Sequence, residues 1–569
     1  MSGETYEQDG AGGTPPGPPS RGNWRQWLPI ALVLMLAAVM RFRGIGDQPL
    51  WLDEGYSWWD ARQSLADLWS LVPQCDPHPP LYFLLLKAWI SVFGDETEAL
   101  RALSALLGMA TTLVLVLAGR LISPLVGVVA GLMFALTPFQ IEFAREARPY
   151  ALLCFGAALL LYGAMRIATR RDAGQRGWWL TGAGALIALW SNNTSVLIVG
   201  SAGAAFAGLY LLDRADRLSL RNLAIVAAAV ALLWLPYLPT LIEQAHGVSS
   251  DFWIQRPEPG WRIINELRFV VSLSVFEAFW PGVLLAGGGL WLLWRTQGWR
   301  VALMVGALAV LPAALNYLVS MTVKPIFLAR TLIGIAPAVI LAGACAVALI
   351  RWRGLRNLAL VALVGAHLAA LWHLAGRDQG KEPWDRIALQ VSAGSGSPRP
   401  VQALAGSAPI VLVAANELVL PLSHALKELD VDVPLKGAPA DFPAPGLAAR
   451  YPSGKCAPAV RAQDLNNLAR VVRDRKTVWF ITRRNNVYDP DNGVVKFLAH
   501  QGLAQVEVKR FMPGFLEVYK FVRQPNPLLF NGRTLTMGGR SEPGPPRPQL
   551  TPNAVTPALD LTAGSRIGY

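Results

Sequence analysis

Long apolar blocks separated by short basic loops run from residue 27 to residue 375, and they restrict this chain to a helical membrane protein. An α-helix needs about 20 largely apolar residues to cross roughly 30 Å of hydrocarbon. Charged residues make up only 16% of the chain, against about 25% in soluble proteins. We predict about eleven transmembrane helices, near 27–43, 98–119, 123–141, 150–168, 178–191, 195–212, 223–241, 269–294, 301–320, 331–350 and 358–375.

The apolar block 80–93 is too short to span unaided, because its helix would rise only about 21 Å. Charge placement indicates where it lies. If this block does not span, the arginines in the loops between the other blocks all face the cytoplasm, as the positive-inside rule favours. We therefore predict an interfacial helix on the outer surface, with Lys87 extending toward the lipid headgroups.

With eleven spans and block 80–93 excluded from them, the N-terminus lies in the cytoplasm. Four loops then lie outside, at 44–97, 142–149, 242–268 and 321–330. The segment after residue 375 also lies outside. The sequence thus predicts a multi-pass protein of the cell inner (plasma) membrane, in contact with the lipid bilayer. Helix orientation explains the net charge of +13 better than nucleic-acid binding does, and we expect no nucleic-acid partner.

The last third of the chain is less apolar. Residues 380–523 alternate strand-like runs with helical stretches, which predicts a small extracytoplasmic α/β domain beside a membrane domain at 27–375. The terminal segments 1–26 and 524–569 are rich in Gly and Pro and are expected to be disordered. The clearest strands are predicted at 410–414 and 477–481, and the clearest helices at 418–429 and 492–501.

Two adjacent carboxylates, Asp53 and Glu54, follow the first apolar block at the outer rim of the membrane. Partial desolvation raises the basicity of a carboxylate, and two neighbouring acids can share a cation. The pair is therefore a candidate general base or metal site, and an ordinary solvated acidic turn is the alternative. If a divalent metal ion is required, Asp53 and Glu54 are the expected ligands.

A histidine stands at a rigid helix entry in the run Asp76-Pro77-His78-Pro79-Pro80-Leu81-Tyr82. The prolines fix the chain and prevent an earlier helix start. His78 and Tyr82 would then face the headgroup level. Taken alone, His78 is more often a structural hydrogen-bond partner than a site residue.

A third cluster places several charges between two spans in the short loop that ends at Tyr150, namely Glu142, Arg145, Glu146 and Arg148. Arginines on the outer side run against the topological bias, so another role must keep them there. Guanidinium groups match phosphate oxygens bidentately, which favours a phosphate or diphosphate ligand. An internal network of arginine and glutamate is the alternative.

Lys324 and Arg330 are two further cations in the outer loop 321–330. Together the outer loops offer carboxylates, a histidine and several cations at membrane level. That combination suits an anionic lipid-linked substrate from which a proton must be removed.

An acidic pair after the first helix, then His-Pro-Pro-Leu-Tyr at 78–82, then Glu-Ala-Arg-Pro-Tyr at 146–150, then a Lys/Arg loop at 324–330 resembles a large group of bacterial polytopic membrane glycosyltransferases. These enzymes are related to the protein O-mannosyltransferases and the lipid A aminoarabinose transferases and have the C-type glycosyltransferase fold. The likeness covers roughly residues 27–375.

This resemblance implies a polyprenyl-phosphate-linked sugar as donor, inversion at the sugar carbon, and an acceptor that is a glycan, lipid or protein. Carried onto this chain, it makes Asp53 the base that takes the acceptor proton, with Glu54 assisting. Glu146 and Arg148 are then second-loop site residues, and Lys324 and Arg330 contact phosphate. Thr331 departs from the family pattern, because many relatives have tyrosine after the arginine.

A transporter or flippase of a lipid-linked or polar substrate is the main alternative, because many spans would also suit it. Transporters usually place binding charges near the bilayer midplane on broken helices. Here the charges gather at one face, which favours an enzyme.

Two of the four cysteines, Cys75 and Cys456, fall on the oxidising side in this topology. A bridge between them would tie the C-terminal domain to the first outer loop. Two unrelated free thiols are an equally good interpretation, because cysteines so far apart in sequence carry no geometric information.

Overall fold

The protein is described by a computed structural model that covers residues 27–169, 175–213, 218–247, 254, 256–257, 260–271, 279–375, 380–395, 409–451, 456–483, 488–489 and 492–524. The predictions of disorder for 1–26 and 524–569 fall outside these residues, apart from Gln524.

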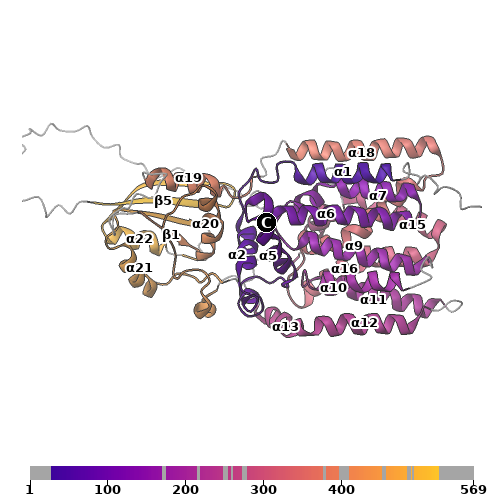
Figure 1. Cartoon of the computed structure of the whole chain (residues 1–569), viewed down its shortest axis with the longest axis horizontal. Coiled ribbons are helices and arrows are strands. Elements are labelled where there is room, and N and C mark those ends of the chain that lie inside the picture. The colour runs from indigo at the N-terminus through magenta and orange to yellow at the C-terminus, as the bar shows by residue number, and fades with distance from the viewer. Residues whose placement is uncertain are drawn as a thin grey trace, which may run out of the picture. The chain divides into compact units, whose positions relative to one another are not determined.

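Apolar helices lie side by side in a bundle between residues 28 and 375 (Figure 1). The helices of this bundle are α1 (Leu28–Phe42), α6 (Thr97–Arg120), α7 (Pro124–Leu136), α8 (Pro138–Ala144), α9 (Tyr150–Ala168), α10 (Arg176–Leu189), α11 (Ser195–Leu212), α12 (Leu220–Trp234), α13 (Leu238–Gly247), α14 (Trp261–Val271), α15 (Phe279–Gln297), α16 (Trp299–Thr322), α17 (Ala336–Ala348) and α18 (Arg353–Ala375). Two 3-10 segments, η2 (Leu235–Tyr237) and η3 (Ala329–Ile335), precede α13 and α17.

Within the described residues, seven helices are long and apolar enough to cross a membrane, or eight if the bent pair α7–α8 counts as one span. A helical multi-pass architecture is thus confirmed, whereas the total of about eleven stays a prediction. The pair bends by 65° at Pro138, since proline lacks the N–H that would continue the helix.

Two predicted helix boundaries are corrected by the structure. The predicted span 269–294 is divided: Val270 belongs to α14, and α15 begins at Phe279. The reason is that α14 is amphipathic, with Arg262, Glu266 and Arg268 on a helix whose periodicity the apolar count overlooked. The predicted span 331–350 starts within the 3-10 segment η3, continues as α17 and ends at Ala348.

The segment 44–97, predicted to be the first outer loop and called the outer loop below, holds four helices: α2 (Leu52–Arg62), α3 (Asp67–Ser70), α4 (Val72–Cys75) and α5 (Leu81–Phe93). The predicted interfacial helix corresponds to α5, a short apolar helix that buries Tyr82 and Phe83 and exposes Val92 and Phe93. The extension of Lys87 toward the headgroups stays a prediction, to which the structure adds a protein contact. The Lys87 ammonium donates 2.8 Å to the carbonyl of Gln63 at the end of α2, where unpaired carbonyls attract a cation.

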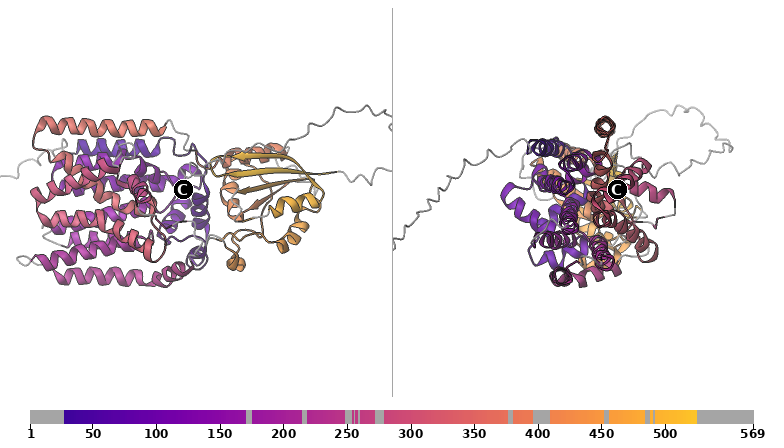
Figure 2. Two further views of the ribbon diagram at one scale, coloured as in Figure 1. Left: turned by 180° about the vertical axis from the view of Figure 1, so that it is seen from behind. Right: turned by 90° about the vertical axis from the view of Figure 1, so that its right-hand side faces the viewer.

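The C-terminal part forms a five-stranded sheet with the order β2-β1-β3-β5-β4, seen from the other side in Figure 2. β1 runs parallel to β2 and β3, and β5 pairs antiparallel with β3 and β4. The strands are β1 (Ile410–Ala414), β2 (Leu435–Gly437), β3 (Thr477–Arg483), β4 (Leu503–Phe511) and β5 (Leu516–Arg523). The helices of this part are α19 (Trp384–Ser395), α20 (Val419–Glu428), α21 (Leu465–Val472) and α22 (Gly493–His500). The predicted strands and helices named above are confirmed.

Alternate residues of β1 enter two hydrophobic cores, one on each face of the sheet. Val411 and Val413 pack with α19 and α20, whereas Leu412 packs with α21 and α22. The first core also contains Leu52 and Tyr56 of the outer loop. The outer loop and the C-terminal sheet therefore share one core.

The open question about the outer-side cysteines is answered by a disulfide between Cys75 and Cys456, whose Cα atoms are 4.8 Å apart. The bridge joins the end of α4 to the C-terminal part across 381 residues of sequence. Cys154 and Cys345 are free and buried, as expected for packing residues.

Candidate active site

The first turn of α2 carries both predicted catalytic acids. Acidic residues are favoured there, because the N-terminus of a helix presents free N–H groups and a partial positive charge. Successive residues of a helix point about 100° apart, so Asp53 and Glu54 enter different surroundings although they are adjacent.

Glu54 is completely buried and fully engaged in hydrogen bonds. Arg101 of α6 grips both oxygens with two bonds of 2.7 Å, and the backbone N–H of Ala147 donates at 3.0 Å. The ammonium of Lys381 lies 3.3 Å away. Burial alone would raise the pKa of Glu54, but Arg101 and Lys381 outweigh it and lower the pKa to about 2. The geometry therefore fits a permanently ionised structural anchor.

Asp53 is less enclosed. Its side chain keeps 10% of its surface exposed, and its Oδ2 lies 3.2 Å from Nη1 of Arg330, whose side chain is 19% exposed. Arg330 comes from η3, far along the chain. The predicted base and one of the predicted phosphate contacts are thus brought together, and both retain access to a ligand.

Arg148 holds the backbone of Asp53. Its Nη1 donates to the backbone carbonyl of Asp53 at 2.9 Å, to Ser57 at 3.2 Å and to Asp76 at 2.8 Å. The guanidinium is almost entirely buried, and the Asp76 and Asp53 charges keep its pKa raised although burial works against this. Arg148 therefore lies in an internal network, the alternative that the sequence left open for its cluster.

His78 completes this network. Its Nδ1 lies 2.5 Å from Asp76 Oδ1 and 3.0 Å from Arg148 Nη2. Burial lowers the pKa of His78, with Asp76 opposing the shift, and the Asp76 carboxyl is held well below its usual pKa by Arg148 and His78 against the effect of burial. The His78 ring also packs edge-to-face against Tyr150, with 5.7 Å between the ring centroids.

Glu146 faces Lys381 on the other side of Glu54. Its Oε1 lies 3.2 Å from the Lys381 ammonium, and its buried Oε2 has no hydrogen-bond partner within the described structure. Burial raises the pKa of Glu146 to about 7, with Lys381 opposing and the Glu54 charge adding to the shift. Glu146 can therefore gain or lose a proton near neutral pH.

The remaining predicted site residues have other contacts. Tyr82 is fully buried and hydrogen-bonds Ser104 of α6 at 2.8 Å, so it packs the scaffold and does not face a ligand. Arg145 donates 2.6 Å to the carbonyl of Gly44 and ties two outer segments together. Glu142 is half-buried at the end of α8, and Lys324 is half-buried between α16 and η3.

Three important residues were not predicted: Asp76, Arg101 and Lys381. Asp76 stood in the His78 motif, and Arg101 is a charge in the second turn of an apolar helix, so both carried a signal that was not used. Lys381 follows the last apolar helix in an ordinary polar run, and nothing in the sequence marks it.

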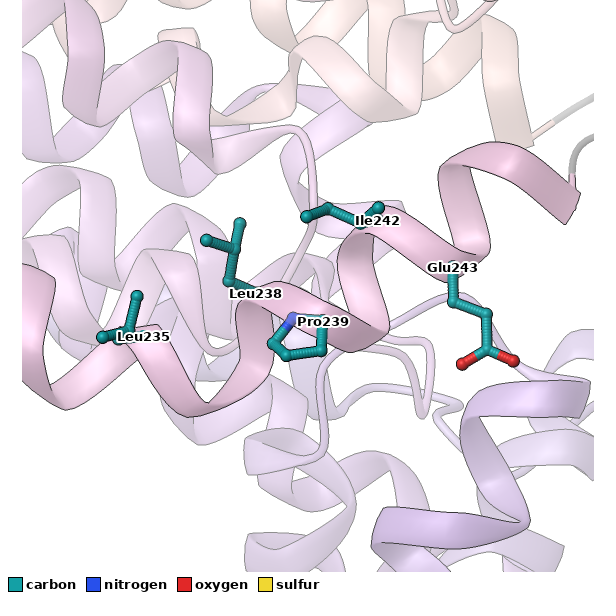
Figure 3. A pocket seen from close by; sticks show the side chains of 5 residues that line it. All are labelled: Leu235, Leu238, Pro239, Ile242 and Glu243. Atoms are coloured by element: carbon teal, nitrogen blue, oxygen red, sulfur yellow. The ribbon is translucent and has the colours of Figure 1, made fainter.

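No three histidine, cysteine, aspartate or glutamate side chains are grouped as metal ligands in the described part of the chain. Both oxygens of Glu54 already accept hydrogen bonds from Arg101, so Glu54 does not offer a vacant ligand position. An apolar surface hollow of about 620 Å³ on η2 and α13, lined by Leu235, Leu238, Pro239, Ile242 and Glu243, shares no residue with the site (Figure 3).

Solved structures of the same fold were found by structural comparison. ArnT from Cupriavidus metallidurans, in the apo state, matches at a TM-score of 0.58 and 16% identity, over 87% of this chain and 99% of that one. ArnT bound to undecaprenyl phosphate matches at a TM-score of 0.57 and 16% identity, over 88% and 100%. The apo oligosaccharyltransferase of Archaeoglobus fulgidus matches at 0.50 and 12% identity, over 80% and 70%.

Sequence comparison gives an independent match. Residues 77–242 match the family model described as dolichyl-phosphate-mannose-protein mannosyltransferase, a segment that begins just before α5 and ends in α13. No curated protein sequence matches the chain. The C-type glycosyltransferase fold and the resemblance to polytopic membrane glycosyltransferases are both confirmed.

Proposed function

We propose that this chain, which has the fold of the C-type glycosyltransferases, transfers a sugar from a polyprenyl-phosphate carrier to an acceptor at the outer face of the cell inner membrane. The family match and the fold support glycosyl transfer. The structure of ArnT with undecaprenyl phosphate supports a lipid-linked donor. The observation that carries the proposal is the accessible pair of Asp53 and Arg330.

The proposed step is an inverting displacement. Asp53 accepts the proton of the acceptor hydroxyl as its oxygen attacks the anomeric carbon. The bond between that carbon and the phosphate oxygen breaks, and the polyprenyl phosphate leaves with both bonding electrons. Arg330 stabilises the negative charge that develops on the leaving phosphate, because a guanidinium matches phosphate oxygens well.

The neighbouring charges have supporting roles in this proposal. Arg148 holds the backbone of Asp53, and Asp76 with His78 holds Arg148. Glu54 is a positioning residue and not a second catalytic acid, because its low pKa and its two bonds from Arg101 leave it no proton to exchange near neutral pH. Glu142 and Lys324, which are half-buried, and Tyr150, which is buried against His78, remain proposed substrate contacts.

The function is tested with purified protein in lipid vesicles and a set of polyprenyl-phosphate sugars, by measuring the release of free polyprenyl phosphate. We expect release with at least one sugar and its reduction in Arg330→Gln, whereas Lys436→Ala, a surface change in the C-terminal sheet, should release as wild type does. Movement of the intact lipid-linked sugar between leaflets without release would support the flippase alternative.

A further inference from the structure

The segment from Lys381 to Trp384, which follows the last helix of the bundle, lies against the first turn of α2. We infer that this segment positions the catalytic base Asp53. Glu382 fixes the start of α2, and Lys381 fixes the carboxylates of Glu54 and Glu146. The inference rests on the proposed function and assigns the segment a role in that same site.

Glu382 completes the cap of α2. The N-cap residue Trp51 makes no side-chain hydrogen bond to the helix, and Glu54 accepts a bond from the N–H of Trp51 at 3.4 Å, so the N–H of Leu52 is left for a partner from elsewhere. The N–H of Leu52 donates to Glu382 Oε2 at 3.2 Å. A carboxylate at this place also interacts favourably with the positive end of the helix dipole. Asp53 is the next residue, so its position depends on this contact.

Glu382 is itself held firmly. The indole N–H of Trp384, a completely buried residue, donates to the same oxygen at 2.8 Å. The other oxygen pairs with Arg483 of β3. The contact chain from β3 through Glu382 to the start of α2 therefore connects the C-terminal sheet to the residue that does the chemistry.

Lys381 fixes the second side of the site. Its ammonium lies between two buried carboxylates from separate elements, at 3.3 Å from Glu54 and 3.2 Å from Glu146. Without this cation the two acids would repel each other in a low-dielectric environment. The loop of Glu146 also carries Arg148, which holds the carbonyl of Asp53. Both residues of the segment thus act on the same short stretch of backbone.

Loss of the cap should affect turnover more than donor binding. The backbone that carries Arg330 belongs to η3 and not to α2, and only the pairing of its guanidinium with Asp53 connects the phosphate contact to the start of α2. A catalytic group that is misplaced by about 1 Å can lose up to a hundredfold in rate. We expect Glu382→Ala to lower turnover about tenfold and to leave donor affinity within about twofold of wild type.

The experiment uses the full chain in lipid vesicles and reports turnover per donor-binding site, so that unfolded protein does not count. Glu382→Gln keeps a carbonyl oxygen for Leu52 and Trp384 and should recover most of the turnover. Lys436→Ala is the matched surface control in the same sheet and should behave as wild type. Turnover of Glu382→Ala per binding site equal to wild type overturns the inference, as does an equal loss of donor binding and turnover.

A second variant covers the case in which Glu382→Ala does not fold. Trp384→Phe removes the indole N–H that orients Glu382, together with part of a buried ring, and we expect about threefold lower turnover per donor-binding site at unchanged donor affinity. Unchanged turnover contradicts the inference. Asp53→Asn is measured in the same experiment. Near-wild-type transfer by Asp53→Asn would contradict the proposed function. An inactive Asp53→Asn together with a fully active Glu382→Ala would contradict only the role of the segment.

Discussion

The surroundings of Glu54 and those of Asp53 are two regions that meet at the start of α2, and they differ in how far they enclose the carboxylate. Around Glu54, Arg101, Lys381 and a backbone N–H enclose the acid completely. Around Asp53, the acid and its partner Arg330 both keep part of their surface exposed. In the proposed mechanism these adjacent acids of one sequence motif therefore have separate roles: Glu54 holds the site together and Asp53 meets a ligand.

The difference follows from helix geometry and from what each face meets. One residue of advance along α2 turns the side chain by about 100°, which takes Glu54 to α6 and leaves Asp53 facing η3. A buried ion pair is destabilising when only one partner is removed, because the other charge stays buried without compensation. Changes at Glu54 should therefore affect folding, and changes at Asp53 should affect chemistry.

The largest effect is expected when both regions lose their common support, the disulfide between Cys75 and Cys456. In the chain-entropy model, a bridge that closes a loop of several hundred residues stabilises the folded state by about 5 kcal/mol. We expect Cys75→Ser with Cys456→Ser to lower the free energy of unfolding by up to that amount, measured by denaturant titration in detergent. A loss below about 1 kcal/mol would mean that the outer loop is held by packing alone.

Glu54→Gln tests the enclosed region. It leaves Arg101 buried without a full counter-charge, and we expect a loss of about 3–5 kcal/mol in stability. The double variant with Arg101→Met should recover part of this loss, since it removes the uncompensated charge. Stability equal to wild type in the single variant would contradict a structural role for Glu54.

The pH dependence of stability separates Glu54 from Glu146. The pKa of Glu54 is depressed to about 2, so its stabilisation is present above about pH 4.5 and is lost as the pH falls toward 2, amounting to about 3 kcal/mol. The pKa of Glu146 is raised to about 7, so the folded state binds the extra proton and stability falls as the pH rises from about 4.5 to 7. The melting temperature, measured from about pH 2 to 7, should no longer fall below pH 4.5 in Glu54→Gln and should no longer fall above pH 4.5 in Glu146→Gln.

Arg330→Gln tests the exposed region. A hydrogen bond to a charged group contributes about 1.5–3 kcal/mol, so we expect donor affinity to fall roughly ten- to hundredfold. Equilibrium binding of a polyprenyl-phosphate sugar measures this change, and the melting temperature should stay close to wild type. Unchanged affinity together with a collapse of stability would make Arg330 a structural residue.

The sequence predicted the helical membrane class, the strands at 410–414 and 477–481, and a cluster of outer-loop charges, because each rests on a local pattern of hydrophobicity or charge. Asp53 and Arg330 were singled out for their position outside the membrane, and the structure brings them together. Only the family resemblance assigned the base to Asp53, because the local residue pattern does not distinguish it from the adjacent Glu54.

The residues that the sequence missed act through long-range contacts. Lys381 lies more than 300 residues from Glu54 along the chain, yet its ammonium completes the surroundings of that carboxylate. The kink at Pro138 and the amphipathic helix α14 were hidden by an apolar count that assumes straight spans. Folding determines which charges become buried, and no local pattern carries that information.

In the proposed mechanism Asp53 is the base and Glu54 holds it in place. The decisive measurement takes one pair of purified variants, Asp53→Asn and Glu54→Gln, and compares melting temperature, donor binding and turnover per donor-binding site. We expect Asp53→Asn to melt and bind donor as wild type does, while turnover falls by about 10²–10⁴. Near-wild-type turnover in Asp53→Asn, with the catalytic loss appearing instead in a stable Glu54→Gln, would contradict it.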